Sequence, residues 1–415
     1  MALSAGSVLY SDVGDILKEV WTVEQLTRTI NNDSEILSKI KPKKGINETG
    51  KYAIVPLEIG GNVQSHARDE GEALGRRGAG TQDQAKYNFK SLYIRFELSG
   101  QVIASTSTNR QAIINEVLYQ PKVAVRDFGN DKARQVIGSS LAGAICKCGT
   151  TSSSTTIVLD VREGWSAIRS GQLAVGKYID IGTSADPDSQ ANSVSITAVT
   201  KSKTAPTITI SGSAISTTSS HYISTEDNRQ TDGDSKELTS LTAICQATGT
   251  IGQVADTVNG WQGNYAGNSG TLRAINTDLL LTALNDSWYN GGNPDLVLAS
   301  AGVRQKYYTS VFQPATRFTN APSEGSDFSK QSSVHFEGMP VITDRAMPSG
   351  KLFMLSTDHL GFYSPNGGSL KWMKGTDGIL NRVPDYDSYV ADAYEYTELG
   401  TANRAAQTLV DDLSE

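Results

Sequence analysis

The sequence predicts an α+β protein, and three patterns support this fold class. Apolar residues recur every three to four positions between residues 107 and 147, which is typical of one long amphipathic helix. Between residues 92 and 98, apolar and charged residues alternate, as they do in a half-buried strand. From about 150 to 234 the chain is rich in Ser and Thr and contains short alternating runs between turn signals. A long helix, long strands and a separate β-rich segment are therefore expected in one chain.

The composition excludes several classes of protein. With 415 residues the chain can form two or three domains, and its 38% hydrophobic and 20% charged residues fit a folded, soluble protein. A net charge of −7 argues against a general nucleic-acid-binding face. No apolar run reaches the roughly 20 residues of a membrane span, and residues 1–7 lack the features of a signal peptide. Three cysteines, an odd number, argue against a disulfide framework and for a reducing compartment.

Residues 1–45 are expected to form an N-terminal arm. A helical pattern follows a tail of small residues, with Asp12 at the position of the helix cap. The apolar face of this helix comprises Val13, Ile16, Leu17, Val20, Trp21, Val23, Leu26 and Ile30. The lysine-rich segment 39–45 is interpreted as a solvated connector, and a phosphate contact is the less favoured alternative.

Residues 46–100 are predicted to form an extended loop, built as a long antiparallel hairpin. The apolar run 52–57 and the alternating run 92–98 are its expected arms. The segment between them is charged and punctuated by glycines, so it has little apolar area to offset the conformational entropy lost on ordering. We therefore expect it to lie on another subunit, where its charged side chains would form ion pairs between subunits. These residues are Arg68, Glu70, Glu72, Arg76 and Arg77.

Residues 101–149 are predicted to contain the long helix. The Ser/Thr run 105–108 offers its N-cap, and Pro121 is expected to kink or interrupt it. Residues 150–234 are then predicted to form an inserted all-β domain, because the strand patterns are too regularly spaced for the alternative, a low-complexity linker. The expected strands lie at 156–161, 178–181, 194–199 and 207–210.

The remaining chain divides into a mixed α/β part at 235–380 and a strand with a tail at 381–415. Helices are expected at 272–289 and 301–312, on either side of a buried strand at 295–299. A strand at 334–342 is expected to turn at Gly338. Further strands are predicted at 352–355, 370–373 and 386–396, and a short helix from Thr401.

Catalytic chemistry finds little support in the sequence. The four histidines, at positions 66, 221, 335 and 359, form no catalytic or metal-binding pattern and are interpreted as structural. Cys146 and Cys148 could form half of a zinc site, but Cys245 stands alone, so reduced thiols at the end of the long helix are favoured. The glycine-rich run 76–80 lacks the following helix of a phosphate-binding loop and is interpreted as a loop tip. No catalytic, cofactor-binding or metal-binding residue is predicted.

Taken in this order, the segments resemble a major capsid protein of a tailed bacteriophage with the Hong Kong 97-type fold. The arm, the extended loop, the long helix and the helix–strand–helix of 272–312 carry the resemblance. Its most specific part is the turn and strand formed by Gly338, Pro340, Val341 and Ile342, which leads to Asp344 and residues 347–350. The resemblance covers most of the chain except 150–234. That segment is similar to β-rich insertions that some relatives display on the capsid exterior.

The resemblance implies the arrangement and the partners of the protein. The long helix would be the spine of a peripheral domain, residues 235–380 would hold an axial domain with strands that return to the peripheral domain, and 381–415 would add a peripheral strand and tail. The extended loop would cross a neighbouring subunit. Copies would assemble through pentamers and hexamers into an icosahedral virion shell in the host cytoplasm. Implied partners are a scaffolding protein, a portal, decoration or minor capsid proteins and double-stranded DNA bound without sequence specificity, with no membrane and no cofactor.

Two features of some relatives are not assigned to this chain. Some relatives carry a cleaved scaffolding segment before the arm; here the arm begins almost at once, so scaffolding is expected to be a removed segment or a separate protein. Others crosslink a loop lysine to an asparagine of a neighbour beside a buried glutamate. Lys86 and Lys90 lie in the predicted loop, but their partners cannot be matched.

A secreted or surface β-rich adhesion module is the alternative function. The Ser/Thr-rich region motivates it, but such a module would lack the long helix and would need an export route. An enzyme is the third possibility, with no motif in its favour.

Overall fold

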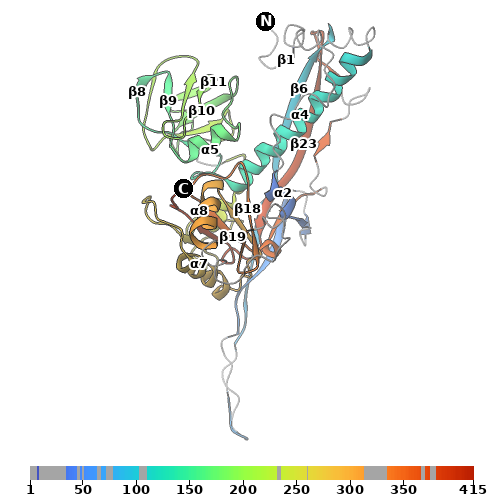
Figure 1. The fold of residues 1–415 in the computed structure, drawn as a ribbon. Coiled ribbons are helices and arrows are strands. Elements are labelled where there is room, and N and C mark those ends of the chain that lie inside the picture. Colours follow the sequence, from blue (N-terminus) through green and yellow to red (C-terminus); the bar gives the residue numbers. More distant parts are fainter. Residues whose placement is uncertain are drawn as a thin grey trace, which may run out of the picture.

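Two long strands, β6 (Lys90–Ser99) and β23 (Ser388–Thr401), pair in antiparallel register along almost their whole length in this computed structural model (Figure 1). The structure describes residues 7–8, 34–43, 47–48, 51–62, 67–71, 78–101, 110–230, 235–258, 260–312, 334–365, 370–373 and 380–415. The pairing runs from Lys90 opposite Thr397 to Ser99 opposite Ser388. It joins segments that lie about 300 positions apart in the sequence, and it forms the centre of a seven-stranded sheet.

The other strands of this sheet are short. In order they run β1-β6-β23-β20-β2, and two further strands pair with β23. Their bounds are β1 Ser7–Val8, β2 Pro42–Lys43, β20 Leu360–Tyr363, β21 Lys371–Trp372 and β22 Asn381–Arg382. The sheet therefore collects strands from both ends of the chain around the β6–β23 pair.

The helix α4 (Arg110–Ile137) lies along this sheet (Figure 1). Alternate β23 residues, including Ala391 and Ala393, are completely buried, as expected for the inner face of a strand with a two-residue period. On the same face, Lys132 of α4 forms an ion pair with Glu395 at 2.5 Å. Small side chains allow the helix to approach the sheet closely, and the ion pair fixes its position along the strand.

The long helix is shorter than predicted. It continues through Pro121 without interruption and ends at Ile137, where Gly138 adopts φ +76° and donates to the carbonyl of Arg134 at 2.7 Å. A Cβ at Gly138 would also meet the Ser240 side chain at 2.3 Å. The apolar pattern to residue 147 belongs to a different element, since Ala144–Lys147 forms the strand β7. The predicted helix over residues 12–30 of the arm lies outside the described residues.

A second, six-stranded sheet forms the central layer of the molecule. Its order is β15-β24-β19-β16-β18-β17. The strand bounds are β15 Asn264–Ala266, β16 Leu296–Ala299, β17 His335–Phe336, β18 Met339–Thr343, β19 Leu352–Leu355 and β24 Thr408–Val410. β17 and β18 meet at a turn in which Gly338 has φ +80°, as the sequence predicts. The predicted helix from Thr401 is wrong: β24 inserts between β15 and β19, where Leu409 and Val410 are buried on opposite faces.

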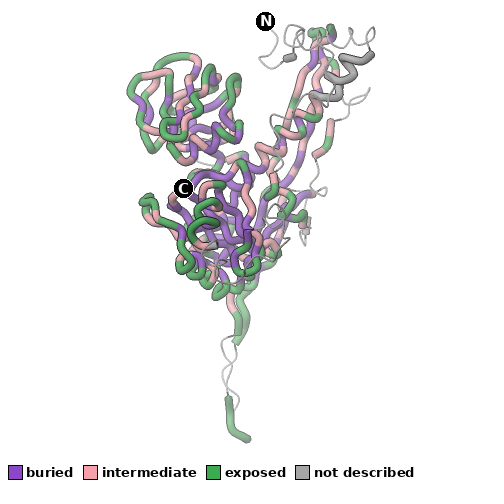
Figure 2. The backbone as a smooth tube through the Cα atoms, in the orientation of Figure 1, coloured by how far each residue is buried: buried purple, intermediate pink, exposed green. Residues whose placement is uncertain are grey.

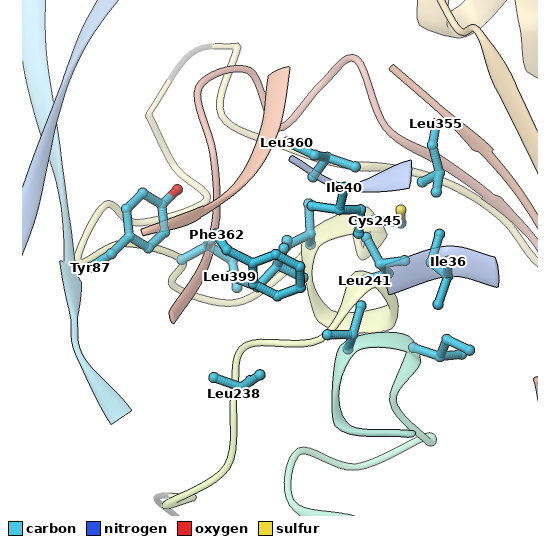
Figure 3. Packing of buried hydrophobic residues seen from close by; sticks show 14 of the residues in the cluster. Ile36, Ile40, Tyr87, Leu238, Leu241, Cys245, Leu355, Leu360, Phe362 and Leu399 are labelled. Carbon is cyan, nitrogen blue, oxygen red and sulfur yellow. The ribbon is translucent and has the colours of Figure 1, made fainter. Parts of the chain in front are cut away.

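Helices cover one face of this central sheet. Val297 of β16 and Met354 of β19 pack with α7 (Thr277–Tyr289) and α8 (Ala301–Tyr307), which continues as a π-helical turn, η1 (Tyr308–Phe312). The other face, with Leu298 and Phe353, joins the largest apolar core. Figure 3 shows how side chains from α2 (Glu35–Lys39), α6 (Leu241–Cys245), β20 and β23 meet in that core.

The hairpin differs from the predicted one in its second arm. β4 (Tyr52–Gly60) pairs with β5 (Thr81–Asn88), and β3 (Asn47–Glu48) lies on the other side of β4. The alternating run 92–98 belongs to β6, where it finds a longer partner in β23. Alternation predicted a strand correctly, but it could not identify a partner about 300 residues away.

A separate β-structure follows α4. Its sheet has the order β7-β14-β10-β11-β12-β9, and the edge strands β7 and β9 meet through an antiparallel bridge between Cys148 and Leu159, so the sheet closes into a barrel. Ile181, Ile196 and Ile208 fill its interior. The strand bounds are β9 Thr156–Val158, β10 Tyr178–Gly182, β11 Ala191–Thr200, β12 Thr207–Ile210 and β14 Tyr222–Thr225, with a flanking pair β8 Thr151–Ser154 and β13 Ile215–Thr217.

Two details of this barrel correct the sequence prediction. The barrel is not all-β, because it includes the helix α5 (Glu163–Arg169). It also begins with β7 at Ala144, ahead of the Ser/Thr-rich segment from residue 150. Three of the four β7 residues are apolar and continue the helical period, which is why the sequence predicts helix there.

A completely buried arginine organises the chain between α6 and the central sheet. The Arg404 guanidinium donates to the carbonyls of Gly249 at 2.7 Å and of Gln246 and Thr248 at 2.8 Å. It also reaches the carbonyls of Ala243, Ile244 and Trp261. Burial lowers the pKa of Arg404 from its usual value. The carbonyl dipoles replace the water that the buried cation has lost.

We expect Arg404→Met to destabilise the fold by about 3 kcal/mol or more, because it leaves several buried carbonyls without donors. Urea unfolding of the unassembled chain would measure this loss. Arg169→Met, which changes an exposed arginine on α5, is the matched control and should shift the free energy of unfolding by less than about 0.5 kcal/mol. Similar losses in the two variants would show that the Arg404 contacts contribute little.

Candidate functional site

The β4–β5 hairpin has a buried base and an exposed outer part. Ala53, Val55 and Leu57 alternate on the buried face of β4, opposite Ala85 and Tyr87 of β5. Leu57 and the half-buried Ile59 are the last residues of β4 that pack on the core, and residues 81–84 of β5 are exposed. The outer ribbon projects away from the rest of the molecule (Figures 1 and 2). An isolated two-stranded ribbon is only marginally stable in water, so this part of the chain is suited to pack on another surface.

Tyr87 anchors the base of the hairpin. Its ring stacks on that of Tyr363 with centroids 5.6 Å apart. Its hydroxyl donates to the Thr401 carbonyl at 2.7 Å and accepts from the Thr401 amide at 3.1 Å. Burial raises the pKa of Tyr87 well above its usual value, so the side chain stays neutral. The hairpin is thereby fixed to the C-terminal end of β23.

A glycine allows a second attachment at the same place. The Lys86 amide donates to the Gly252 carbonyl at 2.8 Å. Gly252 has φ +60°, and a Cβ there would lie 3.0 Å from Ala85 and from the Tyr87 ring. The loop after α6 can therefore approach the hairpin only with glycine at this position, and this contact makes the base rigid while the outer part extends.

The five predicted loop-contact residues are only partly described. Arg68 and Glu70 lie at the far end of the hairpin and are exposed. Glu72, Arg76 and Arg77 lie outside the described residues. The tip is thus a charged surface far from the core, and the ion pairs between subunits remain a prediction.

Buried ion pairs hold the barrel on the rest of the molecule. Arg134 near the end of α4 forms a two-point contact with Glu237, at 2.6 and 3.0 Å, so it joins the segments before and after the barrel. Directly before α5, Arg162 donates to Asp412 at 3.0 Å, and on α5 the Ser166 hydroxyl donates to the Met347 carbonyl at 2.7 Å. The Arg162 guanidinium and two backbone amides hold the pKa of Asp412 below its usual value. These contacts fix the barrel at several separate points.

The cysteines that were considered as metal ligands lie in the apolar cores. Cys146, Cys148 and Cys245 are all buried free thiols, and burial raises the pKa of Cys148 to about 12 and that of the other two above their usual value. All three are fully buried, and Cys146 lies in β7 rather than, as the sequence predicted, at the end of the long helix. Within the described part of the chain, no group of three or more His, Cys, Asp or Glu residues is placed to hold a metal ion. None of the described helices is long and apolar enough to cross a bilayer.

Sequence reasoning missed the residues that position the hairpin. Tyr87, Gly252 and Arg404 act through partners that are distant in the chain, and no local pattern distinguishes them. Glu398 was missed for the same reason: it is buried on β23, where it accepts from the amides of Thr239 at 2.7 Å and Leu399 at 2.9 Å. An acidic residue in an otherwise alternating strand was the only signal available.

Comparison with known proteins finds similarity to phage capsid proteins. Residues 201–371, less than half of the chain, match the family described as SU10 major capsid protein. A structure of the cyanophage A-1(L) capsid asymmetric unit has the same fold, with a TM-score of 0.57 and 13% identity over 95% of this chain and 96% of that one. No curated protein matches the sequence.

More distant structures include the capsid of an empty GTA particle and a structure titled Mycobacterium phage Adephagia. The former aligns over 100% of both chains with 10% identity and a TM-score of 0.48. The latter aligns over 98% of both chains with 9% identity and a TM-score of 0.47.

The environment of Glu398 predicts a pH dependence of stability. Burial raises the pKa of Glu398 to about 7, while in the unfolded chain it returns to its ordinary value. Between these pH values the folded state binds more protons than the unfolded state, so this group lowers stability as the pH rises from about 4.5 to 7. We expect Glu398→Gln, which stays neutral, to make the melting temperature of the unassembled chain fall less across this range. Glu226→Gln, at a half-buried position on the barrel, is the control. An unchanged slope in Glu398→Gln would contradict the assignment.

Proposed function

We propose that the chain is a major capsid protein of the tailed-phage type, which assembles through pentamers and hexamers into an icosahedral shell that encloses double-stranded DNA. The β4–β5 hairpin is the observation that carries this proposal. Its base is fixed by Tyr87, whereas the described residues of its outer part, 61–62, 67–71 and 78–84, are exposed. A neighbouring copy that accepts the ribbon would supply the missing surface, and repetition of this contact would connect copies into a shell.

The proposed partners follow from the same role. Capsid proteins associate with copies of themselves, and we infer that a scaffolding protein, a portal and decoration or minor capsid proteins complete the particle during assembly in the host cytoplasm. DNA would be enclosed without sequence-specific contacts, which is consistent with a net charge of −7. The β-rich adhesion module is not favoured, because the family match extends from residue 201 in the barrel to residue 371 in the seven-stranded sheet.

The barrel is proposed to lie on the outer surface of the shell. It has an apolar core of its own, and its closed sheet leaves no long strand edge for unwanted pairing. A barrel attached through α5 and the Arg134–Glu237 pair could face solvent without changing the sheets that carry assembly. We also infer a structural rather than catalytic role for the chain, in line with the buried, neutral thiols.

Shortening the hairpin tests the proposed function. Gly60 and Thr81 are paired across the hairpin, so residues 61–80 can be replaced by a two-residue Asn-Gly turn. We expect the free chain to keep its melting temperature within a few degrees, because the removed described residues are exposed. Shells seen by negative-stain electron microscopy for the unmodified chain, expressed with its scaffolding partner, should be absent for this variant. Shells of normal yield would show that the hairpin does not connect subunits.

The charges at the hairpin tip are tested separately. We propose that Arg76 and Arg77 take part in ion pairs between subunits, so reversing both to Glu should lower the melting temperature of the shell and increase its sensitivity to salt. The melting temperature of the free chain should not change. Arg382→Glu, at an exposed position in β22, is the control. Unchanged shell yield and melting temperature in the double variant would contradict the ion pairs.

A further inference from the structure

A groove of about 550 Å³ lies between α4, α2 and β21 (Figure 1). Its apolar lining consists of Leu37, Pro121, Val125 and Trp372, and Val125 is 44% exposed. Pro121, Val125 and Gly129 follow one another at intervals of four residues, so they form one stripe along α4. The groove therefore offers an apolar surface that another segment of chain can cover.

Gly129 gives this stripe a place without a side chain. It lies inside α4, where glycine lowers the stability of a helix by roughly 1 kcal/mol relative to alanine. Apart from its own helix, no heavy atom of the described chain would lie within 4 Å of a Cβ at this position. The distance at which two helices pack depends on the side chains at the contact, so a glycine here permits a close approach. The stripe is suited to a second helix.

Both ends of the arm segment 9–33 are fixed beside α4. At its start, β1 pairs with β6, and Val8 lies opposite Leu98. At its end, Ser34 lines the groove, and its hydroxyl donates to Asp344 at 2.7 Å. The chain between these two points must therefore pass from one end of the seven-stranded sheet to the groove.

The length of the segment fits this path. Leu98 lies six residues along β6 from Leu92, which is roughly 20 Å. Leu92 is opposite Glu395, the residue that binds Lys132 of α4. The helix that the sequence predicts at 12–30 would be about 28 Å long. It can therefore run along α4 between the two fixed ends, with a short connection on each side.

The predicted helix also carries a complementary surface. Its apolar residues recur every three to four positions along its whole length and need a partner surface. Residues 12–30 include four acidic and two basic residues. The charged residues that line the groove are Lys122 and Arg126, and Arg126 is already paired with Asp127 at 3.0 Å. Apolar contact would thus contribute most of the attraction, and Lys122 would add a favourable charge.

We propose that residues 12–30 dock as a helix in this groove of their own chain. The docked helix covers Val125, packs closely over Gly129 and joins β1 to α2 along α4. The contact lies within one subunit, so it goes beyond the proposed assembly function. It can be tested on the unassembled chain, where failure to form shells has no influence on the result.

Limited proteolysis of the unassembled, full-length chain tests the contact. Trypsin can cut the predicted helix after Lys18 and Arg28. Val125→Asp places a charge in the groove and should increase the rate of cleavage at both sites by about tenfold, because cleavage follows the population of the undocked segment. Val175→Asp, at an exposed valine of the barrel, is the matched control and should leave the rate unchanged. Equal rates in the two variants would overturn the proposal.

Cross-linking identifies the chain that supplies the helix. Leu26 belongs to the predicted apolar face and lies eight residues before Ser34. The native cysteines are buried, so Leu26→Cys combined with Val125→Cys supplies the thiols for a short bis-maleimide. We expect a link within one chain, seen as a monomer band of altered mobility. Asp127→Cys, which lies on another side of α4, should give far less of it when combined with Leu26→Cys.

Two results of this cross-linking would overturn the proposal. A dimer band without the altered monomer band would assign the docked helix to a second copy of the chain. The absence of any link in the Val125 variant, or equal linking in the Asp127 variant, would show that residues 12–30 do not occupy the groove.

Discussion

The antiparallel pairing of β6 with β23 is the constraint on which the rest of the structure depends. It brings the segment after the hairpin against the C-terminal segment, and ten successive residue pairs fix its register. The register places Ala391 and Ala393 beneath α4 and puts Glu395 within reach of Lys132. It also sets Thr401 where Tyr87 can bind it at two points. A slip by one residue would turn this inner face outward, because side chains alternate along a strand. The position of the helix and the direction of the hairpin thus follow from one ladder.

Local sequence patterns predicted many of the helices and strands, but pairing between distant segments determines which strands lie side by side. The turn at Gly338, the buried strand at 296–299 and the alternating strand at 92–98 are all visible in the sequence and present in the structure. The predicted partner of that alternating strand is wrong, because a period of two indicates which face of a strand is buried but not which strand lies beside it. The prediction that the helix includes segment 144–147 is wrong for a related reason: a short run with three apolar residues fits either period. Arg404 and Gly252 could not be found at all, since their roles exist only after the loop, the hairpin and the C-terminal segment have met.

Buried charges mark the places where separate parts of the molecule join. Arg134 and Glu237 connect the segments on either side of the barrel, Arg162 connects α5 to Asp412, and Arg404 connects the C-terminal segment to the loop after α6. Apolar contacts alone would tolerate small shifts between these parts, whereas two-point ion pairs and multiple carbonyl contacts are lost with small displacements. A buried pair is a weak source of net stability, because desolvation offsets much of its attraction. The contribution of these buried charges is geometric: they hold the barrel, the central sheet and the seven-stranded sheet at defined angles.

Defined angles matter for a protein that must meet copies of itself around a closed surface. The hairpin reaches outward from a base that Tyr87 and Gly252 hold rigid, so its direction is set by the subunit rather than by the partner.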